Sequence, residues 1–140
     1  MHKVVLDTNQ LVSSLLSTQG LQRQLINAWR RRAFLLFLAP GQIDEVAEVL
    51  GRPKIQKKYP ITPGDREAFL LLLRQDALPL PHAAGPGVCR DPHDDYLLGC
   101  AAAVGADYLV TGDDDLLSIG GYGSVAILRA REFLAILSPP

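Results

Sequence analysis

Short apolar runs alternate along the chain with segments whose apolar residues recur at helical spacing, and this alternation constrains the fold most. The strand-like runs cover residues 4–6, 34–38, 78–80, 108–110 and 124–128. Between them, apolar residues spaced three and four apart predict amphipathic helices. Strands that alternate with helices form a parallel sheet covered on both faces, joined by right-handed crossovers. We therefore predict an α/β fold, a three-layer α/β/α arrangement around a parallel sheet of about four or five strands.

Several helix boundaries are marked by proline. Residues 62–65, Thr-Pro-Gly-Asp, combine an N-cap hydroxyl, a proline at the first helical position and an acid in the first turn. Asp91 precedes Pro92 in the same way. Pro53 is expected to limit the helix that follows the second strand, and prolines 139–140 to end the last helix.

Length and composition set broad limits. A chain of 140 residues without repeats or a composition shift fits one domain, which we expect to span residues 1–140. Cys89 and Cys100 lack metal-ligand spacing and, without a secretory signal, indicate reduced thiols, with a disulfide between them as the open alternative. No apolar run approaches the length needed to cross a bilayer. We expect a cytoplasmic protein that makes no use of a membrane.

Acidic residues follow the predicted strands where a parallel sheet gathers functional groups. Asp7 comes directly after the first strand, and Asp113 lies just beyond the strand at 108–110. The carboxyl ends of parallel strands meet at one edge of a sheet, so both acids are expected there. Two further acidic segments lie near helix starts and are expected at the same edge. The acids concerned are Asp7, Glu45, Asp91, Asp94, Asp95 and Asp113.

A cluster of carboxylates indicates a bound cation. Like charges raise each other's pKa and destabilise the fold, and a divalent ion removes that cost. Oxygen ligands without nearby His or Cys ligands suit magnesium or manganese better than zinc; His2, His82 and His93 show no ligand spacing. Such an ion can polarise a phosphodiester and lower the pKa of a bound water. The pattern therefore predicts hydrolysis of a nucleic-acid backbone.

Each acid also has a simpler structural explanation. Asp91 and Asp113 can act as helix N-caps, and Asp7 can cap a helix that begins at Thr8. Acids in a first helical turn, such as Glu45, are favoured by the helix dipole. The coincidence of four such segments favours a functional site.

The four acidic segments resemble the motifs of the PIN-domain family. They are residues 4–9 (Val-Val-Leu-Asp-Thr-Asn), 45–50 followed by Arg-Pro-Lys at 52–54, 91–95 (Asp-Pro-His-Asp-Asp), and 108–113 (Tyr-Leu-Val-Thr-Gly-Asp) with Asp-Leu-Leu at 115–117. The motifs occur in the family's order and cover almost the whole chain. Within the family, the arrangement is similar to VapC-type ribonucleases, the toxin components of toxin–antitoxin modules. The resemblance implies a metal-dependent endoribonuclease.

The resemblance also implies a role for each principal acid. Asp7, Asp94 and Asp113 would ligate magnesium or manganese, and Glu45 would complete the cluster or hold a water. These four residues are the predicted catalytic set.

Other polar residues of the motifs would support these four. Thr8, Asn9 and Thr111 would orient carboxylates or bound water by hydrogen bonds. Asp94 and Asp95 are adjacent, and adjacent helical residues point about 100° apart, so one of the two is expected to be the ligand; the motif favours Asp94. The auxiliary set is Thr8, Asn9, Asp91, Asp95, Thr111 and Asp115.

Basic residues are needed near an acidic site that binds RNA. The run of arginines after Trp29 and the lysines before Tyr59 are the candidates, although basic residues at a helix end are often only solvated, and Trp29 fits a core position. The resemblance further implies a cognate antitoxin that covers the site and a homodimer or higher homo-oligomer. The candidate RNA-binding residues are Arg30, Arg31, Arg32, Lys54, Lys57 and Lys58.

The acidic segments have three alternative interpretations besides a nuclease site. A receiver-like domain would need an acid pair after the first strand and a late lysine, but none follows Lys58. A haloacid-type phosphatase would need an aspartate where Asn9 stands. The remaining alternative is a non-catalytic PIN-like module that binds RNA or protein.

Overall fold

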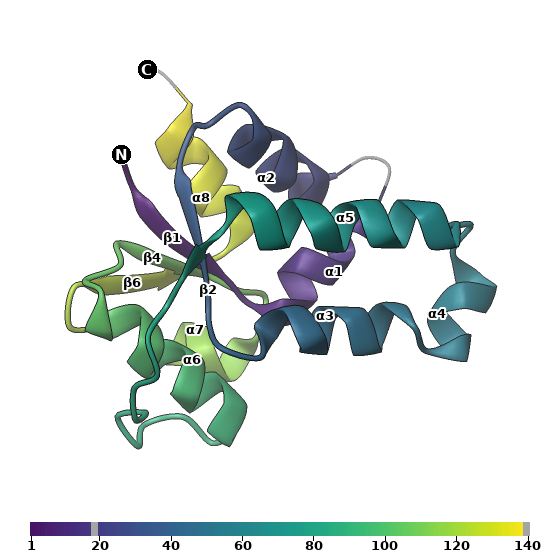
Figure 1. Cartoon of the computed structure of the whole chain (residues 1–140). Coiled ribbons are helices and arrows are strands. Elements are labelled where there is room, and N and C mark those ends of the chain that lie inside the picture. Colours follow the sequence, from purple (N-terminus) through teal and green to yellow (C-terminus); the bar gives the residue numbers. More distant parts are fainter. Residues whose placement is uncertain (18–19, 139–140) are drawn as a thin grey trace.

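A six-stranded sheet forms the centre of the computed structural model, which describes residues 1–17 and 20–138 (Figure 1). Its strands are β1 (Lys3–Leu6), β2 (Leu35–Leu38), β3 (Leu78–Pro79), β4 (Tyr108–Val110), β5 (Gly121–Tyr122) and β6 (Val125–Leu128). The spatial order is β3-β2-β1-β4-β6-β5, with every neighbouring pair parallel except β5 and β6. The predicted α/β fold is confirmed, with a strand more than expected. The extra strand, β5, is a two-residue antiparallel edge that contains no apolar run.

Helices cover both faces of this sheet (Figure 1). Val4 and Leu6 pack into one core and Val5, between them, into the other, as the alternation of side chains along a strand requires. The first core is shared with α1, α2, α3, α5 and α8, and the second with α6 and α7. The helices are α1 (Thr8–Leu16), α2 (Leu21–Arg30), α3 (Gln42–Leu50), α4 (Pro53–Lys58), α5 (Pro63–Asp76), α6 (Pro92–Ala103), α7 (Asp114–Ile119) and α8 (Ala130–Leu137).

Among the residues that the structure describes, proline stands at the start of three helices, α4, α5 and α6. The Thr62 hydroxyl accepts a hydrogen bond from Asp65 N at 3.0 Å, and the Asp65 carboxylate accepts one from Thr62 N at 3.1 Å, which confirms the predicted start of α5. Pro53 ends no helix by itself: it is the first residue of α4, which was not predicted. Prolines 139–140, expected to end the last helix, lie outside the described residues.

The strands β1, β2, β4 and β6 run in one direction, so their carboxyl ends share one edge of the sheet. We refer to it as the carboxyl edge. Asp7 follows β1 there, and Thr111 follows β4. No helix within residues 1–17 and 20–138 is both long and apolar enough to cross a membrane.

Gly99 lets the loop before α6 lie directly against that helix. A Cβ atom at Gly99 would come within 2.3 Å of the carbonyl oxygen of Ala84. We expect Gly99→Ala to destabilise the protein by about 1–3 kcal/mol because the loop must move away. Thermal unfolding checks this against Gly64→Ala, whose new Cβ would meet only the Thr62 hydroxyl at 3.7 Å. An equal loss of stability in both variants would contradict the explanation.

Candidate metal centre

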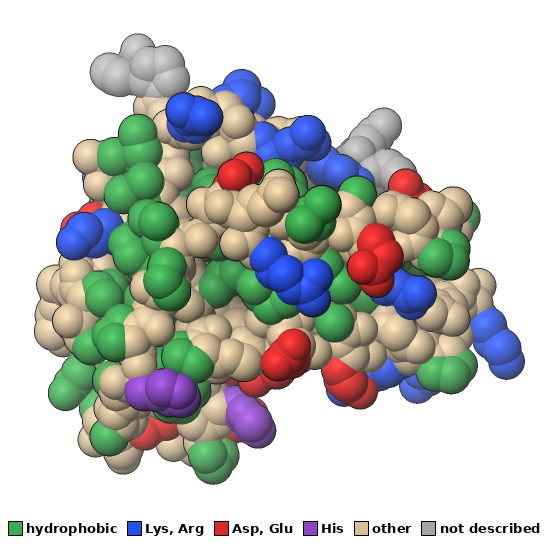
Figure 2. Space-filling model, in the orientation of Figure 1, with side chains coloured by type: hydrophobic (Ala, Val, Ile, Leu, Met, Phe, Trp, Pro, Cys, Tyr) green, Lys and Arg blue, Asp and Glu red, His purple; other side chains and the backbone are tan. Residues whose placement is uncertain are grey.

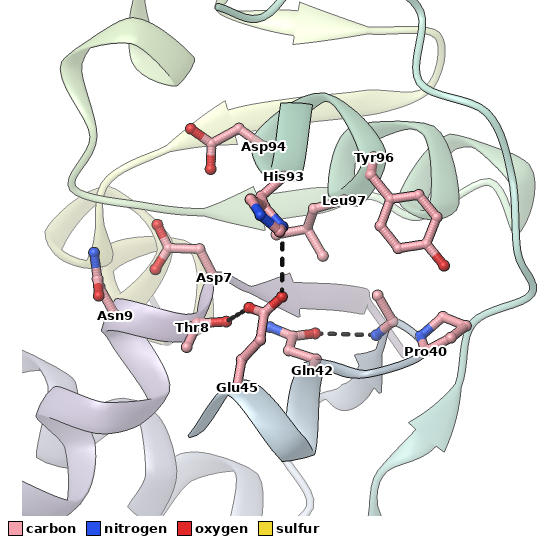
Figure 3. Close-up of a pocket in the computed structure, with 11 residues that line it drawn as sticks. Asp7, Thr8, Asn9, Pro40, Gln42, Glu45, His93, Asp94, Tyr96 and Leu97 are labelled. Atoms are coloured by element: carbon pink, nitrogen blue, oxygen red, sulfur yellow. Dashed lines mark hydrogen bonds and ion pairs between the residues drawn. The ribbon is translucent and has the colours of Figure 1, made fainter. Parts of the chain in front are cut away.

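Three segments bring acidic side chains to a pocket of about 100 Å³ at the carboxyl edge (Figure 3). Asp7 lies at the end of β1, Glu45 in the first turn of α3, and Asp94 in the first turn of α6. In Figure 3, His93 points toward Glu45, and the Asp94 side chain lies above Asp7. The pocket is lined by Asp7, Thr8, Asn9, Ala39, Pro40, Gln42, Glu45, His93, Asp94, Tyr96 and Leu97.

Asp7 is buried, with 8 % of its surface exposed. One carboxylate oxygen accepts a hydrogen bond from Gln10 N at 2.9 Å, and the other accepts one from the Thr111 hydroxyl. Burial raises the pKa of Asp7, an effect that these two hydrogen bonds oppose and the charge of Asp113 reinforces. Asp7 therefore does cap α1, and it also faces a second acid across the site.

Asp94 is the acid most affected by its neighbours. Burial raises its pKa to about 6, with further contributions from the charges of Asp91 and Asp113, a hydrogen bond with Asp113, and the charge of Asp7. Asp113 caps α7 by accepting from Leu116 N at 3.3 Å. Acids from three separate segments therefore influence one another's pKa: Asp7 and Asp113, which follow strands, and Asp94, in the first turn of α6.

Thr111 connects the two acids that follow the strands. Its hydroxyl donates to Asp7 and accepts a hydrogen bond from Asp113 N at 3.0 Å. Thr111 is completely buried, so this arrangement is fixed by the surrounding fold. The side chain lies where it can orient both segments.

Glu45 belongs to the more exposed side of the pocket. One carboxylate oxygen accepts a hydrogen bond from the Thr8 hydroxyl at 2.8 Å, and the other lies 3.7 Å from His93 Nδ1. Asn9 lines the pocket with an exposed side chain. The contact between His93 and Glu45 was not predicted from the sequence, because the spacing of the histidines indicates no ligand role. Its position beside Asp94 in the first turn of α6 was the available signal.

The sequence matches the family model described as the PIN domain over residues 3–115, a span that contains all four principal acids. The chain belongs to the PIN domain family. It is 25 % identical over 120 residues to an uncharacterized protein of Methanocaldococcus jannaschii, an alignment that covers 84 % of this chain and 74 % of that protein. The crystal structure of FitAcB from Neisseria gonorrhoeae has a similar fold, with a TM-score of 0.56 and 16 % identity over 91 % of this chain and 98 % of that one.

Asp95 of this PIN domain does not face the acidic pocket. Its carboxylate accepts hydrogen bonds of 2.9–3.1 Å from the backbone N–H groups of Gly87, Val88 and Cys89. The bond from Cys89 N is the largest cause of the lowered pKa of Asp95. The expected auxiliary role of Asp95 at the site is therefore replaced by a structural one, in which it holds the preceding loop against α6.

We expect Asp95→Ala to release this loop. The amide hydrogens of Gly87, Val88 and Cys89 should exchange with solvent more than about tenfold faster, because each loses its acceptor. Hydrogen exchange followed by NMR measures this. Asp94→Ala is the matched control, and equal protection of these amides in both variants would contradict the assignment.

Two other acids expected in auxiliary roles lie at the margin of the site. Asp91 is exposed and caps α6 by accepting from His93 N at 2.8 Å, while its charge raises the pKa of Asp94. Asp115 is exposed and lies 3.9 Å from the Arg90 guanidinium.

The basic residues predicted to contact RNA lie away from the pocket. Residues 30–32 precede the amino end of β2, at the edge of the sheet opposite the acids. Lys54, Lys57 and Lys58 belong to α4, beyond the far end of α3, a helix about 13 Å long. The face drawn in Figure 2 has Lys and Arg side chains along its top, in its middle and at its right end, Asp and Glu side chains scattered over it, and His side chains in its lower part. Trp29 is buried in the core, as its helical spacing indicated.

The carboxylates at this edge are the kind of ligand that a hard divalent cation prefers, but they lie farther apart than the ligands of a bound ion. Within the described ranges, 1–17 and 20–138, no three His, Cys, Asp or Glu side chains are grouped as a metal site. Asp7 and Asp113 each use a carboxylate oxygen for a helix cap, and like charges keep unneutralised carboxylates apart. Burial raises the pKa of Asp94 to about 6, and the nearby charges of Asp91, Asp113 and Asp7 add to the rise. Carboxylate oxygens in this environment fit Mg²⁺ or Mn²⁺.

Proposed function

We propose that this PIN domain is a metal-dependent endoribonuclease that hydrolyses RNA phosphodiester bonds. The observation that carries the proposal is the mutual interaction of Asp7, Asp94 and Asp113, which come from three segments far apart in the chain. Gathering acids in a partly buried pocket is costly unless a cation neutralises them. These three residues would hold Mg²⁺ or Mn²⁺.

The chain's own residues would organise the reaction around that ion. When bound, such an ion polarises a phosphodiester and supplies a hydroxide-like water near neutral pH. Thr111 would orient Asp7, and Thr8 would orient Glu45, through the hydrogen bonds that these pairs already form. Glu45 lies on the more exposed side of the pocket, where it can hold a water. No side chain is required as a nucleophile.

The biological role we propose is that of a toxin in a toxin–antitoxin module, in a single domain of residues 1–140. The support is the similarity of all four acidic motifs, in order, to VapC-type ribonucleases. An antitoxin that covers the acidic pocket and a homo-oligomer of this chain belong to the same proposal.

A second candidate function is a PIN-like module that binds RNA or protein without cutting. The open spacing of the carboxylates favours it, since no metal-site geometry exists within residues 1–17 and 20–138. The two candidates differ in whether RNA is cut and in what ends are left.

The test is to incubate the protein with a labelled single-stranded RNA of mixed sequence, with Mg²⁺ or Mn²⁺, and to analyse the product ends. Attack by water leaves no cyclic phosphate, whereas attack by the neighbouring 2′-hydroxyl leaves a 2′,3′-cyclic phosphate. The proposal predicts metal-dependent products without a cyclic phosphate. Binding without cleavage would support the second candidate, and cyclic-phosphate ends would exclude metal-activated water as the nucleophile.

A further inference from the structure

Two arginines, Arg90 and Arg129, pair with the first turn of α7, next to the segment that carries Asp113. Arg129 directly follows β6, whose last residue, Leu128, accepts a hydrogen bond from Thr111 N at 3.0 Å. The backbone of Arg129 is therefore one residue away from the pairing that positions Thr111 beside Asp7. Arg90 directly precedes Asp91, the N-cap of α6. The backbones of both arginines therefore lie next to segments that reach the carboxyl edge: Arg129 follows β6, and Arg90 precedes the N-cap of α6.

Each arginine extends toward the first turn of α7. A guanidinium nitrogen of Arg129 lies 3.3 Å from an Asp114 carboxylate oxygen, and one of Arg90 lies 3.9 Å from Asp115. These acids come immediately after Asp113. Two cations are thus held against the segment that carries one of the principal acids.

These ion pairs are open to solvent. The side chains of Arg129 and Arg90 are 57 % and 88 % exposed. Exposed pairs contribute little to stability. A guanidinium has five N–H donors, so one that contacts a single carboxylate keeps other donors free to bind a phosphate. The pairs therefore serve better to position the arginines than to stabilise the fold.

An acidic pocket repels a polyanion unless cations lie beside it. The arginines at residues 30–32 lie at the opposite edge of the sheet, and the lysines of α4 lie beyond the far end of α3. Arg90 and Arg129, by contrast, contact the two acids that directly follow Asp113. His93 lies beside Glu45, on the other side of Asp94.

We propose that Arg90 and Arg129 bind two backbone phosphates of a single RNA strand on the α7 side of the acidic pocket, positioned there by Asp115 and Asp114. The inference rests on the proposed function for its ligand, an RNA strand, and departs from it in naming the path of that strand. It replaces residues 30–32 as the phosphate-binding arginines.

The test is RNA binding at several salt concentrations, with Asp7→Asn as the background so that the strand is not cut. Fluorescence anisotropy of a short labelled single-stranded RNA gives the dissociation constant and its salt dependence. We expect Arg90→Gln and Arg129→Gln each to weaken binding about five- to tenfold. Each should also lower the slope of log affinity against log salt by about 0.7, the value for one phosphate contact on a single strand.

Two further variants separate this effect from general damage. Arg31→Gln removes an exposed arginine at the opposite edge and should leave affinity and slope unchanged. Arg129→Lys keeps the charge and should retain the salt slope while binding more weakly than arginine. Circular dichroism and thermal unfolding should show all variants folded, because the replaced side chains are exposed.

Unchanged affinity and slope in Arg90→Gln and Arg129→Gln would overturn the inference, as would the absence of RNA binding at low salt. Weaker binding in Arg31→Gln alone would place the RNA strand at the opposite edge of the sheet. These results are separable from the fate of the proposed function. If the wild-type protein cuts RNA and the arginine variants bind it normally, only the inference about the arginines is refuted. If binding depends on the arginines but the wild-type protein does not cut, only the proposed nuclease activity is refuted.

Discussion

Replacing Asp7 with asparagine is expected to lower the rate of metal-dependent RNA cleavage by more than about 100-fold, while the protein stays folded. The substitution removes the negative charge and one ligand oxygen from the most buried acid of the pocket. It keeps an oxygen that can accept the hydrogen bond from Gln10 N, and asparagine caps helices as well as aspartate does. The amide nitrogen then faces Thr111 and donates to its hydroxyl, which reverses the direction of the hydrogen bond between these two side chains. Because burial already raises the pKa of Asp7, a neutral side chain suits this position, and the free energy of unfolding should change by less than about 1 kcal/mol.

Initial rates on a labelled RNA measure the loss, and thermal unfolding measures the stability. Asp44→Asn is the matched control: Asp44 is an exposed acid in the first turn of α3 that does not line the acidic pocket, so its rate should stay within about twofold of wild type. Full activity in Asp7→Asn would refute its role at the site. An unfolded Asp7→Asn protein would show that its hydrogen bonds, rather than its charge, dominate.

The second large effect concerns Asp94 and the stability of the protein. With no divalent ion present, the raised pKa of Asp94, about 6, means that the folded state binds a proton more tightly than the unfolded state. This contribution to stability is complete below the unfolded pKa, near 3.8, and is lost as pH rises through about 6. The metal-free protein should therefore gain stability from Asp94 between pH 7 and pH 5, and Asp94→Asn should lose that gain.

Divalent ions should reverse this dependence. An ion at 100 times its dissociation constant stabilises the folded state by about 2.7 kcal/mol, which raises Tm on the order of 10 °C for a chain of this size. Protons compete with the ion for Asp94, so the increase in Tm should shrink as pH falls below about 6. Differential scanning calorimetry with and without Mg²⁺ measures both effects. Asp94→Asn should lose most of the ion-dependent increase and Asp44→Asn should keep it; an equal increase in the two variants would refute Asp94 as a ligand.

Much of the fold is visible in the sequence because its signals are local. The run that ends at Asp7 and the cap at Asp91 both mark real boundaries, since an apolar strand and an Asp-Pro helix start depend on few distant contacts. Elements without such a signal were missed. Residues 121–122 form a strand only because they pair with β6, and Pro53 is compatible with either the end or the start of a helix.

The site depends on contacts between residues far apart in the sequence, so its prediction was less complete than that of the fold. Placing acids after strands brought Asp7 and Asp113 together, because parallel strands share an edge. The structural role of Asp95 depends on three backbone N–H groups of a folded loop, which no residue pattern reveals. The arginine run at residues 30–32 looked suitable by composition alone, whereas its distance from the pocket follows from which end of β2 it precedes.

The proposed use of a divalent ion by the acidic pocket to cut RNA is tested most directly by removing the ion and restoring it. Wild-type protein and Asp7→Asn, purified identically, are treated with EDTA and then given Mg²⁺ or Mn²⁺ in the presence of labelled single-stranded RNA of mixed sequence. We predict that EDTA stops cleavage by the wild-type protein, that either ion restores it, and that Asp7→Asn stays inactive throughout. Cleavage that persists in EDTA, or that the ion restores equally in Asp7→Asn, would contradict the claim.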